Sequence, residues 1–217
     1  MRWKIKLVPL LASLLVPVAV LMASTQAFAA YSFNGSDAAS YADTYWSSYN
    51  TAYPAFSDDC TNFVSQSLAA GYLPEIADFD AHTGLYVDTT DNNYWFYDNG
   101  AYSNSWTVAA DLYDSLMLTG YGTLYATRSG ASTQLMTGMV KGDVLFYNWG
   151  EYGNPTGTAG INHATIQTGY GTTTDGYTDA NYVDAHTQNH YHVLWSLITY
   201  NQNAATTTIY LVHINPS

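Results

Sequence analysis

One cysteine and one histidine have the chemistry and the local sequence of a nucleophile and its base. Cys60 is the single cysteine of the 217-residue chain, and residues 60–70 predict a helix that begins at this thiol. Free N–H groups and the dipole at a helix start favour negative charge, so we expect a stabilised thiolate. His163 follows a glycine-rich turn at the start of a predicted strand. From there its imidazole could accept the thiol proton and return it to a leaving amine.

A third polar residue should orient the imidazole. The strand predicted over residues 181–187 would lie next to the strand of His163. Because successive side chains of a strand alternate, Asp184 and His186 share one face of it. Either could hold His163. We favour His186, with Asn189 as a more distant choice.

Both residues of the pair also have ordinary structural interpretations. Cys60 cannot form a disulfide within this chain, and it could be a small buried core residue. A lone histidine in a strand is often solvated or simply hydrogen-bonded. Alkylation separates the two interpretations of Cys60. An activated thiol should react well below the ordinary pKa of about 8.5, whereas a buried thiol should not react in the folded protein.

Acyl transfer further needs hydrogen-bond donors for an oxyanion. The backbone N–H of Cys60 is the first candidate. The second donor could be the Tyr53 hydroxyl or come from the region of Asp59, although Asp59 could instead cap the helix. Three side chains could line the substrate groove, or else be ordinary core and capping residues: Trp95, Ser105 and Trp106.

The elements that must position these residues predict an α+β fold. Amphipathic patterns predict helices over residues 37–49, 60–70 and 105–118. We expect Ser36 to cap the first helix and Gly71 to end the second in a left-handed conformation. Residues 72–103 lack periodicity and predict long loops that wall a cleft. β-rich runs predict strands over residues 144–149, 161–170, 181–187, 193–200 and 206–213. Helices followed by strands predict N-terminal helices packed on a C-terminal antiparallel sheet.

The first segment has the pattern of a secretory signal. Arg2, Lys4 and Lys6 precede an apolar run, and residues 27–29 read Ala-Phe-Ala, as signal peptidase requires. We therefore expect cleavage after residue 29, a single domain over residues 30–217 and a secreted, extracellular protein. A retained membrane anchor is the alternative, but the apolar run is short for a span.

The charge balance excludes some partners. The whole chain has 5 basic and 17 acidic residues. Without the first 29 residues, Arg128 and Lys141 are the remaining basic side chains and the formal charge is −15. Two cations cannot neutralise a phosphate track, so we expect no nucleic acid, no anionic membrane and no polyanionic substrate. The few charged side chains are also consistent with an acidic or harsh setting, and we expect a monomer.

Two rival functions use other residues. His186, His190 and His192 together with Asp184 are metal-ligand types at close spacing. The geometry of a strand makes it difficult for these side chains to bind one metal ion together, so we expect neither a metal nor a cofactor. Alternatively, the 21 tyrosines and 6 tryptophans could form the stacking platforms of a non-catalytic binding module for glycans or cell wall.

Several short motifs occur along the chain in a recognisable order. The most specific is Asp-Cys-Thr-Asn-Phe-Val-Ser-Gln at residues 59–66. Further motifs lie at residues 49–56, 94–97, 103–107, 141–144, 162–166 and 185–187. In this order they resemble the putative amidase domain family, which is grouped with the NlpC/P60-like and CHAP-like papain fold. The chain departs from the family pattern at Ser67, often a second cysteine in members, and at Ala70, usually a glycine.

The resemblance implies a papain-like fold and a cysteine–histidine pair with a third polar residue on the next strand. Residue by residue, these roles fall on Cys60, His163 and, less directly, His186. The implied activity is that of a cysteine-dependent amidase or peptidase working through a thioester. Its substrate could be a peptidoglycan stem peptide, another peptide or a smaller amide. An acyltransferase that uses the same thioester remains an alternative.

Overall fold

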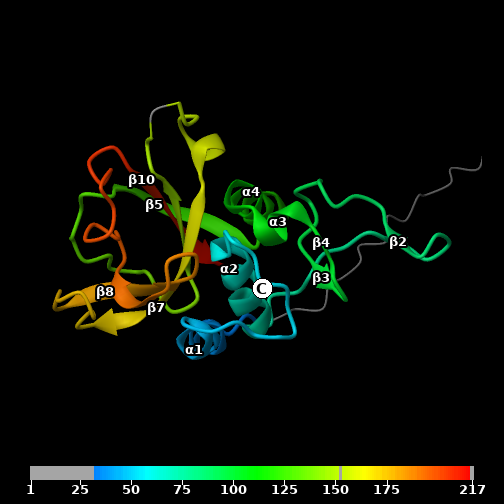
Figure 1. Cartoon of the computed structure of the whole chain (residues 1–217), viewed down its shortest axis with the longest axis horizontal. Helices are drawn as coiled ribbons and strands as arrows, with labels where there is room; N and C mark the ends of the chain where they lie inside the picture. The colour runs from blue at the N-terminus through cyan, green and yellow to red at the C-terminus, as the bar shows by residue number, and fades with distance from the viewer. Residues whose placement is uncertain (1–31, 152, 216–217) are drawn as a thin grey trace, which may run out of the picture.

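The computed structural model describes residues 32–151 and 153–215, and it has the α+β order expected from the sequence (Figure 1). The helical elements are α1 (Gly35–Tyr45), α2 (Cys60–Ala70), α3 (Asn104–Thr107), α4 (Ala109–Thr119) and the 3-10 turn η1 (Thr158–Gly160). They precede or flank an antiparallel sheet built from the second half of the chain. The predicted secretory segment, residues 1–29, lies outside the described residues.

The sheet has six strands in the described part of the chain, and every neighbouring pair is antiparallel. The strands are β5 (Gly122–Ser129), β6 (Val144–Asn148), β7 (His163–Gly171), β8 (Ala180–Ala185), β9 (His190–Leu194) and β10 (Thr208–Ile214). Their order across the sheet is β5-β10-β6-β7-β8-β9. The sequence predicted four of them closely and missed β5, and it placed β9 too late, over residues 193–200, so that His190 lies in the strand and not in the expected turn. As predicted, β8 lies beside β7.

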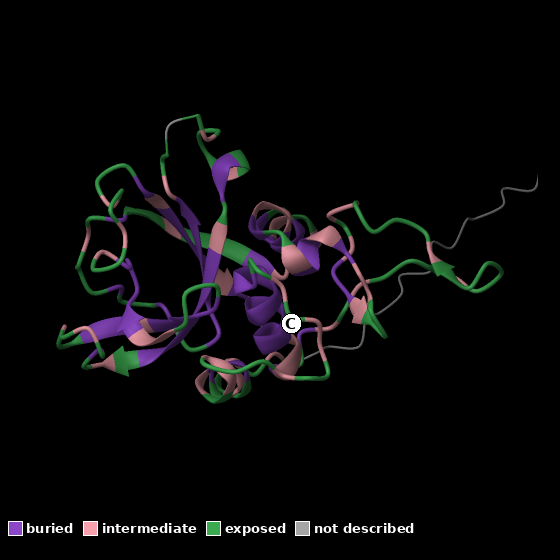
Figure 2. Cartoon of the chain, viewed as in Figure 1, coloured by how far each residue is buried: buried purple, intermediate pink, exposed green. Residues whose placement is uncertain are grey.

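Helix α2 is the central element of the helical layer. It begins at Cys60, as predicted, and contacts α1, α3 and β7. Residues 60–68 are all buried, and Figure 2 shows α2 as the most continuously buried helix. Such a helix is held by packing on every side, which fixes the position of its first turn, where Cys60 lies.

The sheet separates two apolar cores. The core between sheet and helices includes Phe63 and Leu68 of α2 together with Ala164 and Ile166 of β7. The core on the opposite face includes Tyr147 of β6 and residues from β8 to β10. Because strand side chains alternate, the residues of β7 on either side of Ala164 face this second core.

The helix ends differ from the predictions in detail. Asn34, and not Ser36, caps α1, since its Oδ1 accepts the N–H groups of Ser36 and Asp37 at 3.0 and 3.2 Å. Gly71 follows α2 with φ −79°, so it is not left-handed. A Cβ there would come within 2.6 Å of the Phe33 ring, and close packing therefore requires the glycine. The helix predicted over residues 105–118 is split into α3 and α4 at the extended residue Val108.

The long connection between α2 and α3 does not wall the cleft that we expected. It carries two short hairpins, β1 (Phe79–Asp80) with β2 (Leu85–Tyr86), and β3 (Tyr97–Asp98) with β4 (Ala101–Tyr102). Figure 1 shows the β1–β2 hairpin projecting away from the sheet. No helix among the described residues is long and apolar enough to cross a membrane.

Packing of α4 against the sheet predicts that two leucines of that helix contribute very differently to the free energy of unfolding. Leu112 is fully buried, whereas Leu118 is 62% exposed. We expect Leu112→Ala to lower the free energy of unfolding by about 2–5 kcal/mol, because it leaves a cavity. The matched change Leu118→Ala should cost less than about 0.5 kcal/mol. Urea denaturation measures both values, and equal losses would contradict the packing described.

Candidate active site

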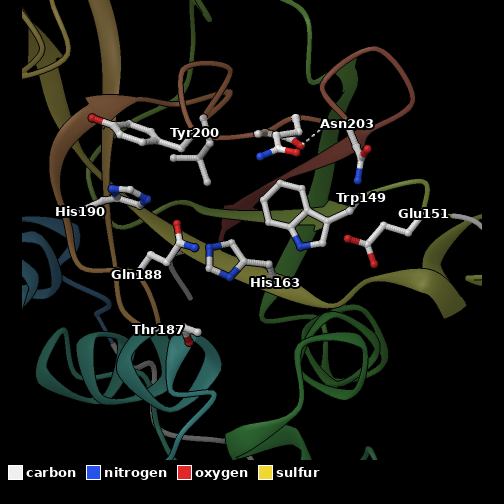
Figure 3. Close-up of a pocket in the computed structure, with 11 residues that line it drawn as sticks. Trp149, Glu151, His163, Thr187, Gln188, His190, Tyr200 and Asn203 are labelled. Atoms are coloured by element: carbon white, nitrogen blue, oxygen red, sulfur yellow. Dashed lines mark hydrogen bonds between the residues drawn. The ribbon is translucent and has the colours of Figure 1, made fainter.

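A cavity of about 350 Å³ opens where β6 ends and β7 begins. Its wall is completed by the β8–β9 turn and by a loop before β10. The lining residues are Trp149, Glu151, His163, Thr187, Gln188, His190, Leu197, Tyr200, Asn201, Gln202 and Asn203. Figure 3 shows His163 between Gln188 and Trp149, with Thr187 next to the ribbon of α2. Of the residues singled out from the sequence as catalytic, His163 lines this cavity.

His163 presents a neutral imidazole to the cavity. Its ring lies against the rings of Trp149 and Tyr147, with centroid separations of 5.2 and 5.5 Å. Burial lowers the pKa of His163 to about 4, because a charged ring would lose its hydration. No hydrogen bond from this ring occurs within residues 32–151 and 153–215. The neighbouring His190 also has a lowered pKa, caused first by burial and then by His163.

Cys60 is the first residue of α2 and is only 6% exposed. Its sulfur lies 3.6 Å from Thr61 Oγ1. Burial raises the pKa of the thiol, although hydrogen bonds from Thr61, the backbone of Ala164 and Thr187 act in the opposite direction. The expected thiolate is therefore not the resting state, because loss of hydration outweighs the helix start.

The contact between β7 and Cys60 is made by the backbone of the strand. The backbone of Ala164 lies near enough to the Cys60 sulfur to lower the pKa of the thiol, and Ala164 itself faces the helical core. His163 precedes it and therefore faces the other side, where it pairs with Tyr147 of β6. Within the described residues no hydrogen bond joins Cys60 and His163.

Thr187 links Cys60 to the cavity. Its Oγ1 accepts the backbone N–H groups of Asp59 and Cys60 at 2.9 and 3.1 Å, and the same residue lines the cavity. The amide that we expected to bind an oxyanion is therefore already occupied by a hydroxyl. Thr187 also has φ +78°, a strained conformation for a β-branched residue. Sequence reasoning missed Thr187, although it belongs to the motif at residues 185–187.

His186 has a different role from the one expected. Its Nδ1 lies 2.8 Å from Asp59 Oδ2, and its Nε2 donates to the Tyr45 carbonyl at 2.7 Å. The ring also stacks on Phe63 at 4.1 Å. With both nitrogens engaged, His186 does not orient His163.

The buried side chain of Asp59 joins several elements through hydrogen bonds. Its Oδ1 accepts the Phe56 amide at 3.0 Å and the Asn62 side chain at 2.9 Å. Asp59 occupies the N-cap position of α2, as expected, but its side chain makes no capping hydrogen bond there. Because its remaining oxygen bonds His186, Asp59 ties the end of β8 to the start of α2.

Asp184 does not reach His163 either. Its Oδ1 accepts the His192 amide at 2.7 Å and the Thr168 hydroxyl at 3.2 Å. Burial, assisted by the nearby Asp43, raises the pKa of Asp184 to about 8. This carboxyl group therefore belongs to a separate cluster with α1 and β9.

Of the two interpretations left open for Trp95, Ser105 and Trp106, the structure supports buried core residues and not the lining of a groove. Trp106 is fully buried and its Nε1 donates to Asn62 at 2.9 Å, while the Trp95 indole donates to Ser65 at 3.1 Å. The Ser105 hydroxyl is buried and bonded to Ser103 at 2.8 Å. The Tyr53 ring packs on Trp106 and Tyr97. None of the four lines the cavity: the two indoles bond side chains of α2, and Tyr53, which we considered as an oxyanion donor, also lies outside it.

The lowered pKa of His163 predicts an acid-dependent loss of stability. An unfolded chain binds this proton from about pH 6.5 downward, whereas the folded chain binds it only near pH 4. The free energy of unfolding should therefore decrease as the pH falls from about 6.5 towards 4. His163→Gln should show a weaker decrease, while Gln188→Ala, a nearby cavity variant that does not titrate, should behave as wild type. Denaturant unfolding across this range measures the effect, and identical curves for all three proteins would contradict it.

Comparisons with known proteins agree with the motif order. The model of the putative amidase domain family matches residues 32–210. The uncharacterized protein YhbB of Bacillus subtilis (strain 168) is 33% identical over 137 residues, which make up 63% of this chain and 37% of that protein. The chain thus spans little more than a third of this relative. No solved structure matches. Since the family match covers most of the chain, including Cys60, His163 and Thr187, the chain belongs to the putative amidase domain family.

Proposed function

We propose that this protein is a secreted amide hydrolase in which Cys60 is the nucleophile and His163 the general base. Family membership indicates amidase activity. The observation that carries the mechanism is the position of Thr187. Its hydroxyl accepts hydrogen bonds from the two amides at the start of α2. The same residue borders the cavity that contains the neutral imidazole of His163, which makes no hydrogen bond within the described residues.

The first step is exchange of the Thr187 hydroxyl for a substrate carbonyl. Both oxygens are hydrogen-bond acceptors, and both fit the paired N–H groups of Asp59 and Cys60. The strained backbone of Thr187 lowers the cost of moving the β8–β9 turn. After the exchange, the carbonyl carbon lies near the thiol and its oxygen is polarised by two amides, as an oxyanion site requires.

Proton transfer follows when the turn has moved. The thiol of Cys60 gives its proton to His163, and the resulting thiolate attacks the carbonyl carbon. His163 then protonates the leaving amine as the C–N bond breaks, and water hydrolyses the thioester to a carboxylic acid. Catalytic contacts often form only with substrate bound, and the backbone of Ala164 already lies near the sulfur.

The lining of the cavity supports a peptide substrate. Side-chain amides of Gln188, Asn201 and Asn203 and the ring of Tyr200 border it, and they can pair with backbone N–H and C=O groups of a bound peptide. A single acidic side chain, Glu151, lies among them. We propose cell-wall peptides as the substrate class, which agrees with the secretion pattern of the first 29 residues.

The rival proposal of an aromatic-rich binding module receives less support. Trp95, Trp106 and Trp195 are each no more than 1% exposed, so these rings are core residues and not stacking platforms. Trp149 lines the cavity, but there it packs against His163. The ring is therefore better explained as part of a catalytic site.

Loss of either catalytic group should abolish hydrolysis. We expect Cys60→Ala to be inactive on cell-wall fragments and mixed peptides, because no other thiol is present in the chain. His163→Gln should lose about 10²–10⁴-fold in rate, the usual contribution of a general base. Mass spectrometry of the products measures both effects.

The matched control for the base is His82→Gln, at an exposed position outside the cavity, and it should retain full activity. Circular dichroism should show all variants folded. Undiminished cleavage by Cys60→Ala would remove the thiol from the mechanism. Equal losses in the two histidine variants would remove His163.

Removal of the Thr187 hydroxyl should make Cys60 more reactive. Thr187→Gly accepts the positive φ without strain and frees both amides, whereas Thr187→Ser keeps the hydroxyl. Loss of this acceptor weakens the closed turn by about 1–3 kcal/mol, so iodoacetamide should alkylate the glycine variant about tenfold faster or more. The serine variant should resemble wild type. Equal alkylation rates in all three proteins would show that Thr187 does not control the thiol.

A further inference from the structure

A second cluster of chemically active side chains lies between α1, β8 and β9. Asp43 of α1, Asp184 of β8 and His192 of β9 each offer one ligand atom, and these atoms lie within 4.8 Å of one another. None of the three lines the cavity that holds His163. The cluster is therefore a separate site, and it differs from the set of three histidines considered from the sequence because Asp43 replaces His186 and His190.

The buried carboxylate of Asp184 has one oxygen without a partner among the described residues. The residue is fully buried, and its Oδ2 has no hydrogen-bond partner. Neither Arg128 nor Lys141 pairs with it in the described part of the chain. A second carboxylate, that of Asp43, lies beside it, with its ligand atom within 4.8 Å of that of Asp184. A buried carboxylate oxygen without a donor is costly, so the arrangement favours a cation between the two groups.

His192 is held in a fixed orientation toward the same point. Its ring lies between those of Tyr182 and Tyr191, with centroid separations of 4.2 and 3.8 Å. Its Nε2 is 2.7 Å from Asp43 Oδ1, and its backbone N–H donates to Asp184. A ligand whose ring is clamped on both faces loses little freedom when it binds a metal, which favours affinity.

We propose that Asp43, Asp184 and His192 bind one divalent cation, and that zinc fits this set best. Two carboxylate oxygens and one imidazole nitrogen are ligands that zinc prefers, with water as the fourth. The side chains of Asp43 and His192 are 34% and 21% exposed, so solvent can supply that water. On binding, His192 Nε2 coordinates through its lone pair, and any proton on it leaves to solvent. The ion would fasten α1 to the two strands that flank the turn of Thr187.

Metal titration of the whole protein tests this site without any activity assay. After removal of bound metal with a chelator, Zn²⁺, Mn²⁺, Ca²⁺ and Mg²⁺ are added separately and followed by calorimetry and thermal unfolding. We use the Cys60→Ala protein, so that the thiol cannot bind the metal. We expect one zinc ion per chain and a higher melting temperature, with a smaller effect of the other three.

The ligand variants decide between a metal and a shared proton. Asp184→Asn should lose at least about tenfold in zinc affinity, and so should Asp43→Asn, which lies at a more exposed position and tests the site if the first variant fails to fold. Asp179→Asn, an exposed aspartate outside the cluster, should bind as well as the parent protein. The proposal is overturned if no cation binds or if zinc binds equally to Asp43→Asn. A proton shared by the two carboxyl groups would then explain the cluster.

Discussion

The hydrogen bond between Asp59 and His186 is the contact on which the site depends. Both residues are almost fully buried, and their 2.8 Å contact joins the end of β8 to the residue before Cys60. Since a backbone carbonyl only accepts, the bond to Tyr45 places a proton on His186 Nε2. A second proton must lie between Nδ1 and the carboxylate, so the pair is neutral overall. Such a pair can be buried without an unpaired charge.

This contact determines where Thr187 lies. The residue follows His186 directly, and its hydroxyl thereby reaches the two amides that begin α2. Burial keeps the Cys60 thiol and the His163 imidazole neutral, and His163 is followed directly by Ala164, whose backbone lies near the sulfur. The resting protein is consequently a closed form, in which the proposed nucleophile and the proposed base are both neutral and no hydrogen bond joins them within the described residues. A neutral thiol behind a hydroxyl is protected from oxidation, which would suit the secretion that we propose.

Local features of the site could be predicted from the sequence, and nonlocal ones could not. The start of α2 at Cys60 follows from a local pattern, and so does the position of His163 at the beginning of β7. The face on which His163 lies depends on its register opposite Tyr147, and a shift of one residue would reverse it. His186 contacts Asp59 before α2 and Tyr45 of α1, and Asp184 lies near Asp43 of α1, all of them far away in the sequence. The sequence left Trp95, Ser105 and Trp106 open between core and groove, because a buried polar network and a groove use the same residue types.

The most direct measurement is identification of the acylated residue during turnover. The protein is mixed with an activated acyl substrate such as a nitrophenyl ester, quenched in acid and mapped by peptide mass spectrometry. The account predicts an acyl group on Cys60, in a yield that rises when Thr187 is replaced by glycine and disappears when Cys60 is replaced by alanine. Turnover without acylation of Cys60, or acylation at another residue at the same rate, would contradict it.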